Sequence, residues 1–249
     1  MNQLQMLGRR LWIFSVWSLV GFFLVNLIAM IATVITSSTA TRWLRSWLPD
    51  AYTFKWYSSA WSEFQLDDVL ITTFQVVFAV VALSGIFGVP AAYAMARRDY
   101  PGKNIVMLLF LLPMLVPPVT FGIPLATVLY KAGLGGTMVG VILANLVPTV
   151  PFVILVMIPF IEQIDPKIEA AARVFGASTF QLFWRILLPL LLPGMLAALL
   201  LVLVRTIAMF ELTFLTAGPT SQTLVVALYY AVFAAGVRAV QSIDAMAVI

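Results

Sequence analysis

Long runs without a charged residue constrain the fold of this chain more than any other feature. Six such runs cover residues 11–41, 69–96, 104–130, 132–161, 186–204 and 212–237. A membrane-spanning helix needs roughly 20 consecutive apolar residues; five of the runs exceed that length and one nearly reaches it. The runs are continuously apolar, whereas membrane β-strands alternate in polarity. The sequence therefore predicts an all-α, polytopic helical membrane protein with about six transmembrane helices.

Two missing residue types exclude most enzyme classes. The chain has no His and no Cys, which excludes Ser-His-Asp and Cys-His nucleophiles, thiolate or imidazole metal sites, and disulfides. A phosphate-binding loop is also absent, because Gly102-Lys103 is followed by Asn104 rather than Ser or Thr. We therefore expect no enzyme, no metal site and no cofactor in this chain, and any nucleotide it depends on must be hydrolysed by another chain.

Basic residues set the expected orientation. Arg9 and Arg10 precede an apolar stretch from Leu11 to Ile35, which is longer than the roughly 7–15 residues of a cleaved signal and predicts a retained helix. With its N-terminus in the cytoplasm, the connection from Ser37 to Asp68 lies outside. The loop from Arg97 to Lys103 holds three basic residues and one acidic residue, as expected for a cytoplasmic loop.

The remaining spans follow from the apolar runs. We expect helices at about Val69–Ala96, Asn104–Tyr130, Met138–Ile161 and Leu187–Leu215, with Glu162–Arg185 in the cytoplasm. Three prolines predict an irregular third helix without solute contact: Pro113, Pro117 and Pro118. The run from Thr223 to Gly236 is either a sixth span or a shorter outer helix before a span that begins near Val240, of which the sequence holds only half.

The cytoplasmic segment carries local signals for a helix, an elbow and a second helix. Asp165-Pro166 is an N-cap followed by a proline at the first helical position. Gly176 can end that helix in the left-handed conformation, and Ser178 with Gln181 forms a capping box for a second short helix limited by Pro189. On these features alone, an ordinary amphipathic surface helix is equally compatible.

The order of residues in this segment resembles the EAA loop of type I ABC importer permeases. The likeness is carried by Ile168–Ser178 (IEAAARVFGAS), Phe183–Pro189 (FWRILLP) and Pro193-Gly194. The family's glutamate usually stands where this chain has Ala170, and Glu169 lies one position earlier. One carboxylate in place of a pair weakens the expectation of a fixed ion pair at this site.

The resemblance covers roughly residues 69–249, which it identifies as the permease domain, with an incomplete last helix. Other positions that match are Ala96–Lys103, Pro113, Pro117, Pro118, Leu134–Thr137 and Glu211. Residues 1–68 form an N-terminal transmembrane helix and external segment, and Trp56-Tyr57 suits the spermidine/putrescine permease branch. Permeases for phosphonates, opines and ferric iron have related patterns.

This resemblance implies an importer subunit in the bacterial inner membrane. Its partners are a homologous permease subunit, two cytosolic ATPase subunits that bind ATP and Mg, an external solute-binding protein and the lipid bilayer, with no nucleic acid. In this family the loop seats in a groove of the ATPase and passes its motion to the membrane helices. The loop residues concerned are Glu169, Ala170, Ala171, Ala172, Gly176, Ala177 and Ser178.

Polar residues inside the spans are candidates for the translocation pathway. Asn145 and Thr149 lie four residues apart on one helical face, where polar groups meet a wet cavity or a neighbouring helix. Arg205 and Glu211 are six residues apart, about 600° around a helix, so they are not one ion pair. Glu211 would stabilise a cationic solute or form a salt bridge with another subunit.

We therefore expect translocation of a small solute, with a polyamine or a similar cationic or organic solute as the first candidate. An ion-gradient-driven carrier or a channel that works alone is the alternative. An intramembrane enzyme has little support, because no Lys for a Ser/Lys dyad lies inside an expected span.

Overall fold

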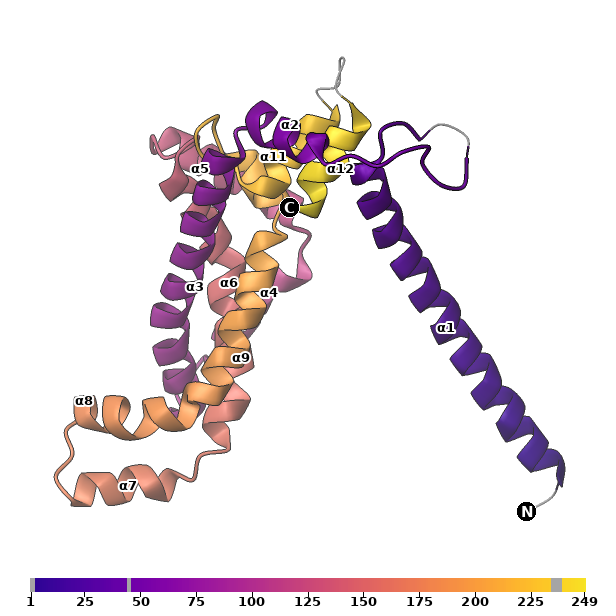
Figure 1. Ribbon diagram of the computed structural model, residues 1–249. Helices are drawn as coiled ribbons and strands as arrows, with labels where there is room; N and C mark the ends of the chain where they lie inside the picture. Colours follow the sequence, from indigo (N-terminus) through magenta and orange to yellow (C-terminus); the bar gives the residue numbers. More distant parts are fainter. Residues whose placement is uncertain (1–2, 44–45, 234–238) are drawn as a thin grey trace. The chain divides into compact units, whose positions relative to one another are not determined.

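The chain divides into two helical units. The structure, a computed structural model, describes residues 3–43, 46–233 and 239–249 (Figure 1). One unit combines residues 1–66 with 228–249, and the other comprises residues 67–227. The sequence-based division into 1–68 and 69–249 stays a prediction, and each unit is described by itself below.

Three long apolar helices form the frame of the unit at 67–227. They are α3 (Leu66–Arg97), α6 (Met138–Glu162) and α9 (Leu188–Ile207). In its most apolar stretch α6 is 56% buried, against 28% for α3 and 28% for the helical stretch that ends in α9. α6 is therefore the central helix of this unit, and more of the surface of α3 and α9 is exposed.

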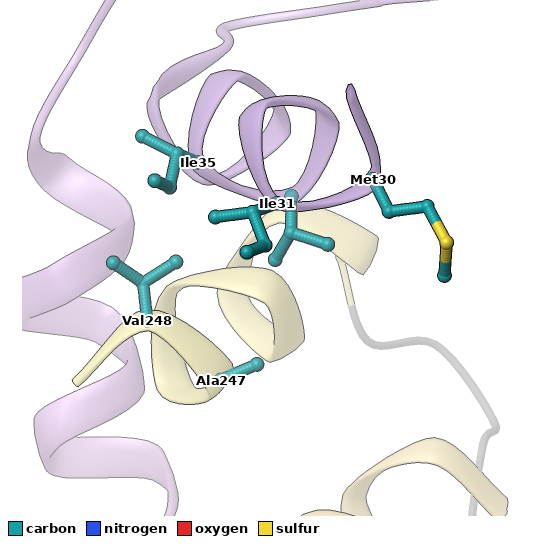
Figure 2. Close-up of a pocket in the computed structure, with 6 residues that line it drawn as sticks. Met30, Ile31, Ile35, Ala247 and Val248 are labelled. Atoms are coloured by element: carbon teal, nitrogen blue, oxygen red, sulfur yellow. The ribbon is translucent and has the colours of Figure 1, made fainter. Parts of the chain in front are cut away.

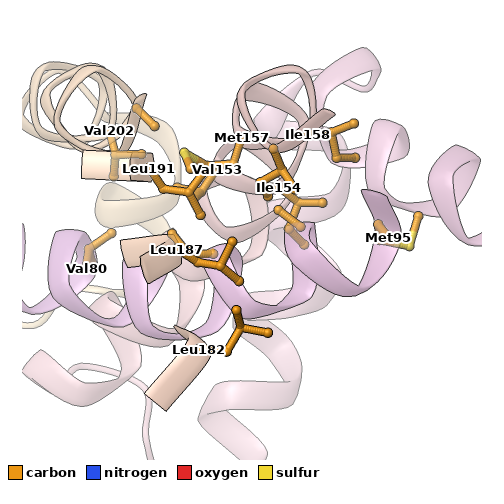
Figure 3. Close-up of a cluster of buried hydrophobic side chains, with 14 of the residues drawn as sticks. Val80, Met95, Val153, Ile154, Met157, Ile158, Leu182, Leu187, Leu191 and Val202 are labelled. Carbon is orange, nitrogen blue, oxygen red and sulfur yellow. The ribbon is translucent and has the colours of Figure 1, made fainter. Parts of the chain in front are cut away.

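The main hydrophobic core lies between these three helices. Figure 3 shows side chains of α3, α6 and α9, such as Val80, Ile154 and Leu191, converging on one cluster. Leu182 and Leu187 belong to the same cluster and are each 1% exposed. The segment that precedes α9 is thus packed onto the core.

The third expected span is broken. α4 (Lys103–Leu115) and α5 (Pro118–Lys131) meet at an angle of 101°. Val116 and Pro117 are extended, with ψ of 134° and 135°, because a residue before proline avoids the helical region and neither Pro117 nor Pro118 has an N–H to donate. The continuous helix expected at Asn104–Tyr130 is therefore wrong, although the irregular backbone at Pro117 and Pro118 is confirmed. Pro113 stays inside α4.

The fifth expected span is also interrupted. α9 ends at Ile207, Met209 N–H bonds the carbonyl of Thr206 in a tightened last turn, and the chain restarts as α10 (Glu211–Thr216). α10 packs on α5 and α6, where Leu129, Ala144, Met209 and Leu212 form a second apolar cluster. The single helix expected at Leu187–Leu215 is therefore two segments.

Pro189 does not limit the second short helix as expected. α8 (Thr179–Leu182) continues through a π-helical turn, η1 (Phe183–Leu187), directly into α9. The N–H of Leu188 bonds the carbonyl of Phe183, a five-residue step. This wider turn ends at Leu187 and α9 begins at Leu188, so Pro189, which has no N–H, lies in the first turn of α9 and does not stop the helix.

The other unit is built on the N-terminal helix α1 (Gln3–Thr39). No residue is buried in its most apolar stretch, whereas Ser38 near the end of the helix is 0% exposed. The end of α1 is tied to α2 (Lys55–Glu63), where Ser38 and Tyr57 share a hydrogen bond of 2.8 Å. Ser37 donates to Asp244 in α12 (Val240–Val248).

An apolar cavity of about 470 Å³ lies between α1 and α12. Figure 2 shows Met30, Ile31 and Ile35 of α1 with Ala247 and Val248 of α12 around it. No charged side chain lines this cavity. Its surface matches the hydrocarbon surroundings that α1 itself requires.

The structure contains four helices long and apolar enough to cross a membrane, or five if α4 and α5 are counted as one broken span; this count covers only the described residues. α11 (Leu224–Phe233) has 10 residues, about 15 Å, which is half a hydrocarbon core. A sixth span over Thr223–Gly236 is therefore not found within the described part of that run, whose last three residues lie outside it. The polytopic all-α fold is confirmed.

The contact between α6 and α9 generates a stability prediction. A Cβ added at Gly194 of α9 would lie 2.6 Å from the ring of Phe160 on α6. We expect Gly194→Ala to cost about 1–3 kcal/mol through overpacking, measured as a lower Tm of the detergent-purified protein. Gly21→Ala in α1 is the control, because nothing lies within 4 Å of the added carbon. An unchanged Tm in Gly194→Ala would contradict the close packing.

Candidate functional site

The segment between α6 and α9 folds as a helix, an elbow and a second helix, as expected. α7 (Pro166–Val174) begins where Asp165 Oδ1 accepts a 2.9 Å hydrogen bond from the Lys167 N–H. Gly176 has a φ of +83°, which ends the helix at low cost for glycine. Ser178 and Gln181 form the capping box at the start of α8. Figure 1 shows α7 and α8 as two layers at one end of this unit.

The two sides of α7 differ in exposure. Glu169 and Ala172 are each 8% exposed and face the core, whereas Ala170 and Ala171 are exposed. Beyond them, Val174 is 85% exposed and Phe175 is 90% exposed. Gly176 and Ser178 at the elbow are exposed, and Ala177 is half-buried. The outer side of the loop thus carries the two exposed alanines together with larger exposed residues and ends in two unburied apolar side chains, as expected of a contact site.

Glu169 is clamped to the end of α3. Its Oε1 lies 2.7 Å from Arg97 Nε, and its Oε2 accepts a 2.5 Å hydrogen bond from the Tyr93 hydroxyl. Arg97 also donates to the carbonyl of Ile164, at 2.6 Å, in the turn between α6 and α7. The side chains of Arg97 and Glu169 are only 14% and 11% exposed. Glu169 therefore does form a fixed ion pair, and the sequence-based doubt about such a pair is wrong.

Sequence reasoning missed Tyr93 and Arg97 as members of this site. The signal was present, because the two residues are four apart and share one face of α3. Nothing in the sequence, however, relates that face to Glu169, 72 residues after Arg97. The clamp, which consists of Glu169, Tyr93 and Arg97, forms because α7 packs against the end of α3.

Asn145 and Thr149 make hydrogen bonds between helices. The Asn145 side chain donates to Thr213 of α10 at 3.2 Å and to the carbonyl of Val141 at 2.9 Å. Thr149 accepts a 2.9 Å bond from Ser84 of α3 and donates to the carbonyl of Asn145. Both residues are buried, at 1% and 0% exposure. Their geometry is that of helix-to-helix bonding, and their role in a pathway stays a prediction.

Asn145 keeps one free acceptor. Its side-chain oxygen is buried and accepts no hydrogen bond from the described residues. An unsatisfied polar group of this kind costs about 1–3 kcal/mol, so a donor from water or from a solute would be stabilised there. This oxygen is the feature that keeps Asn145 among the pathway candidates.

Arg205 and Glu211 lie on two separate segments, α9 and α10, and not on different faces of the single helix that was expected. Arg205 is on α9 with its guanidinium 5.5 Å from the centre of the Phe152 ring, a cation–π contact. Glu211 begins α10 and is half-buried, without an ion pair to any described residue. The structure thus separates a cation that packs on α6 from a carboxylate without a cationic partner. No group of three or more acidic side chains that could hold a metal occurs in the part of the chain described.

The clamp predicts how firmly α7 is held. Glu169→Gln removes the charge from two hydrogen bonds, each worth about 1.5–3 kcal/mol to a charged group. We therefore expect amide hydrogen exchange in residues 166–175 to rise at least about tenfold, while Tyr93→Phe gives a smaller rise. Glu162→Gln is the control, because this exposed carboxylate makes no ion pair with the described residues. Equal exchange in Glu169→Gln and the wild type would show that the clamp does not hold α7.

The fold of this chain is also found in solved structures. A bacterial ABC transporter involved in the import of the acidic polysaccharide alginate contains a chain that matches with a TM-score of 0.79 at 18% identity. The match covers 97% of the present chain and 91% of the other. At this identity the likeness shows the fold alone.

Curated relatives match about half of the chain. The probable sulfate transport system permease protein cysT of Chlorokybus atmophyticus is 33% identical over 150 residues, which cover 55% of this chain and 52% of the relative. The molybdenum transport system permease protein ModB of Haemophilus influenzae is 34% identical over 155 residues, which cover 55% and 67%. The chain thus spans about half to two thirds of the length of these relatives.

A family model also matches most of the chain. It is described as binding-protein-dependent transport system inner membrane component and matches residues 84–249, from the middle of α3 to α12. The matched residues include the helix–elbow–helix segment and its neighbours on α6 and α9. The resemblance to importer permeases is confirmed at this level. The chain belongs to the family of binding-protein-dependent transport system inner membrane components.

Proposed function

We propose that this protein is the membrane-spanning subunit of an ATP-driven importer and that α7 with its elbow docks on a cytosolic ATPase subunit. The observation that carries the proposal is the two-sided character of α7. Its outer side leaves Val174 and Phe175 almost fully exposed, while its inner side is fixed to α3 through Glu169. A segment that is open to a partner and firmly joined to a spanning helix can transmit displacement.

The proposed assembly contains a second, homologous permease subunit, two ATPase subunits with ATP and Mg, and an external solute-binding protein. The N-terminus and the α7–α8 end face the cytoplasm of a bacterial inner membrane, in line with Arg9, Arg10 and the basic loop after α3. Closure of the ATPases moves α7, and the Arg97–Glu169 pair carries that movement to α3. The bonds from α6 to α3 and α10 then spread it through the unit.

Two indications of the solute point in opposite directions. Glu211, a half-buried carboxylate without a cationic partner among the described residues, favours a cation such as a polyamine. The names of relatives, sulfate and molybdenum permeases, favour a small oxyanion. We propose an oxyanion as the first solute to test, because relatives with two different named solutes share this chemistry. A polyamine is the second candidate.

Gly176→Asp tests the coupling role. Gly176 needs a positive φ and has open space around it, so Asp adds backbone strain and a negative charge at the elbow without a clash. We expect normal membrane insertion but loss of solute-stimulated ATP hydrolysis in the reconstituted complex. Gly102→Asp is the matched control, because Gly102 also has a positive φ, of +86°, and nothing within 4 Å, yet lies outside the α7–α8 loop.

The outcomes separate the competing functions. Unchanged stimulation in Gly176→Asp, or an equal loss in Gly102→Asp, would contradict coupling through this elbow. Uptake by the chain alone, driven by an ion gradient and independent of ATP, would favour a secondary carrier or channel instead.

Glu211→Gln tests the solute class. A carboxylate in the pathway repels an oxyanion, so removal of its charge should leave sulfate or molybdate uptake equal or increased. For a polyamine the same change should lower uptake, because a stabilising charge is lost. Uptake of labelled sulfate, molybdate and spermidine into proteoliposomes with the matching binding proteins decides between them. A loss of oxyanion uptake in Glu211→Gln would count against the proposed solute.

A further inference from the structure

A groove of about 450 Å³ lies between the last turns of α3 and the α8–η1 segment. Its floor is apolar and includes Leu182 and Leu187, each 1% exposed, with Pro90 on the α3 side. Phe180 and Trp184 stand at its rim, 71% and 53% exposed. The groove therefore has an apolar base and an aromatic edge.

The groove has a single charged side chain in its lining, Arg98, which is exposed just beyond the end of α3. The neighbouring charges are already paired, Arg97 with Glu169 and Asp99 with Lys103 at 3.1 Å. Arg98 itself makes no ion pair with the described residues. The mouth of the groove therefore offers an unneutralised guanidinium, and Thr179 also belongs to the lining.

The depth of the groove suits a molecule with two different ends. Pro90 precedes Arg98 by eight residues, which is about 12 Å along a helix. The apolar run of α3 ends at Ala96, so Pro90 lies at hydrocarbon depth and Arg98 at headgroup depth. Trp184 is the type of residue that lies at this boundary. A free inorganic anion would use only the mouth and leave the apolar floor empty.

We infer that this groove binds an anionic phospholipid, with its phosphate headgroup on Arg98 and Thr179 and one acyl chain along Pro90, Leu182 and Leu187. Guanidinium groups pair with phosphate in two parallel hydrogen bonds. Basic pockets between membrane helices are established headgroup sites. Because the groove joins α3 to the segment that follows the elbow, a bound lipid would span the two elements that hold α7. The inference depends on the membrane fold and not on the proposed transport function.

The experiment compares two lipids that differ only in headgroup. The full chain is purified in detergent and titrated with phosphatidylglycerol or phosphatidylcholine of the same acyl chains, and bound lipid is counted by native mass spectrometry. We expect the wild type to retain phosphatidylglycerol more tightly. Arg98→Gln should weaken phosphatidylglycerol binding about fivefold, the effect of one basic residue at an anionic membrane surface, and Arg98→Lys should restore most of it.

Arg185→Gln is the matched control, because Arg185 is an exposed guanidinium on η1 that does not line the groove. Selective loss in Arg98→Gln supports the site. An equal loss of phosphatidylglycerol binding in both variants would indicate diffuse electrostatic attraction and would overturn the inference. Unchanged phosphatidylglycerol binding in Arg98→Gln would overturn it too, because Arg98 would then not hold the headgroup. Equal retention of the two lipids by the wild type, or displacement of phosphatidylglycerol by millimolar inorganic phosphate, overturns it as well. A Tm equal to that of the wild type verifies that Arg98→Gln is folded.

Discussion

A lipid bilayer offers the backbone no hydrogen-bond partner, and the unit at 67–227 is organised around that constraint. Any break in a membrane helix must be covered by protein or water. This unit has two such breaks, after Leu115 and after Ile207. The segments that follow them, α5 and α10, pack on each other and on α6. Leu212 and Leu215 of α10 lie against Gly122 of α5, and Thr213 bonds Asn145 of α6. The central helix thus shelters the irregular backbone.

In the same unit, side-chain bonds attach α7, which lies at the surface, to the frame helix α3. Glu169 is the only carboxylate on α7, and it meets two residues from a single face of α3. Because Arg97 also bonds the carbonyl of Ile164, it ties together the end of α3, the turn after α6 and α7. Each group in this cluster has a partner of opposite charge or polarity in a largely buried setting, which is the condition under which such pairs are strong. The π-helical turn then carries α8 into α9 without a loop.

Local features of the fold were readable from the sequence, and features that join distant residues were not. The caps at Asp165 and Ser178 and the positive φ of Gly176 follow from neighbouring side chains and from the lack of a Cβ, so the helix–elbow–helix was predicted correctly. The uninterrupted helices expected at Asn104–Tyr130 and Leu187–Leu215 were wrong, because apolarity alone does not distinguish a straight span from two packed segments. The proline pair at 117–118 predicted irregular backbone at the first break, whereas nothing local in the sequence marks the tightened turn before Met209.

The sequence by itself determined that this chain is a bundle of membrane helices and where the elbow at Gly176 lies, because both depend on composition and on contacts within a few residues. It also carried the motif by which the family could be identified. Only the tertiary structure decided that Glu169 is held by Tyr93 and Arg97, that Asn145 and Thr149 join three helices, and that Arg98, which makes no ion pair among the described residues, lines an apolar groove. These arrangements bring together residues far apart in the chain, and such proximity is set by how whole helices pack and not by the order of neighbouring side chains.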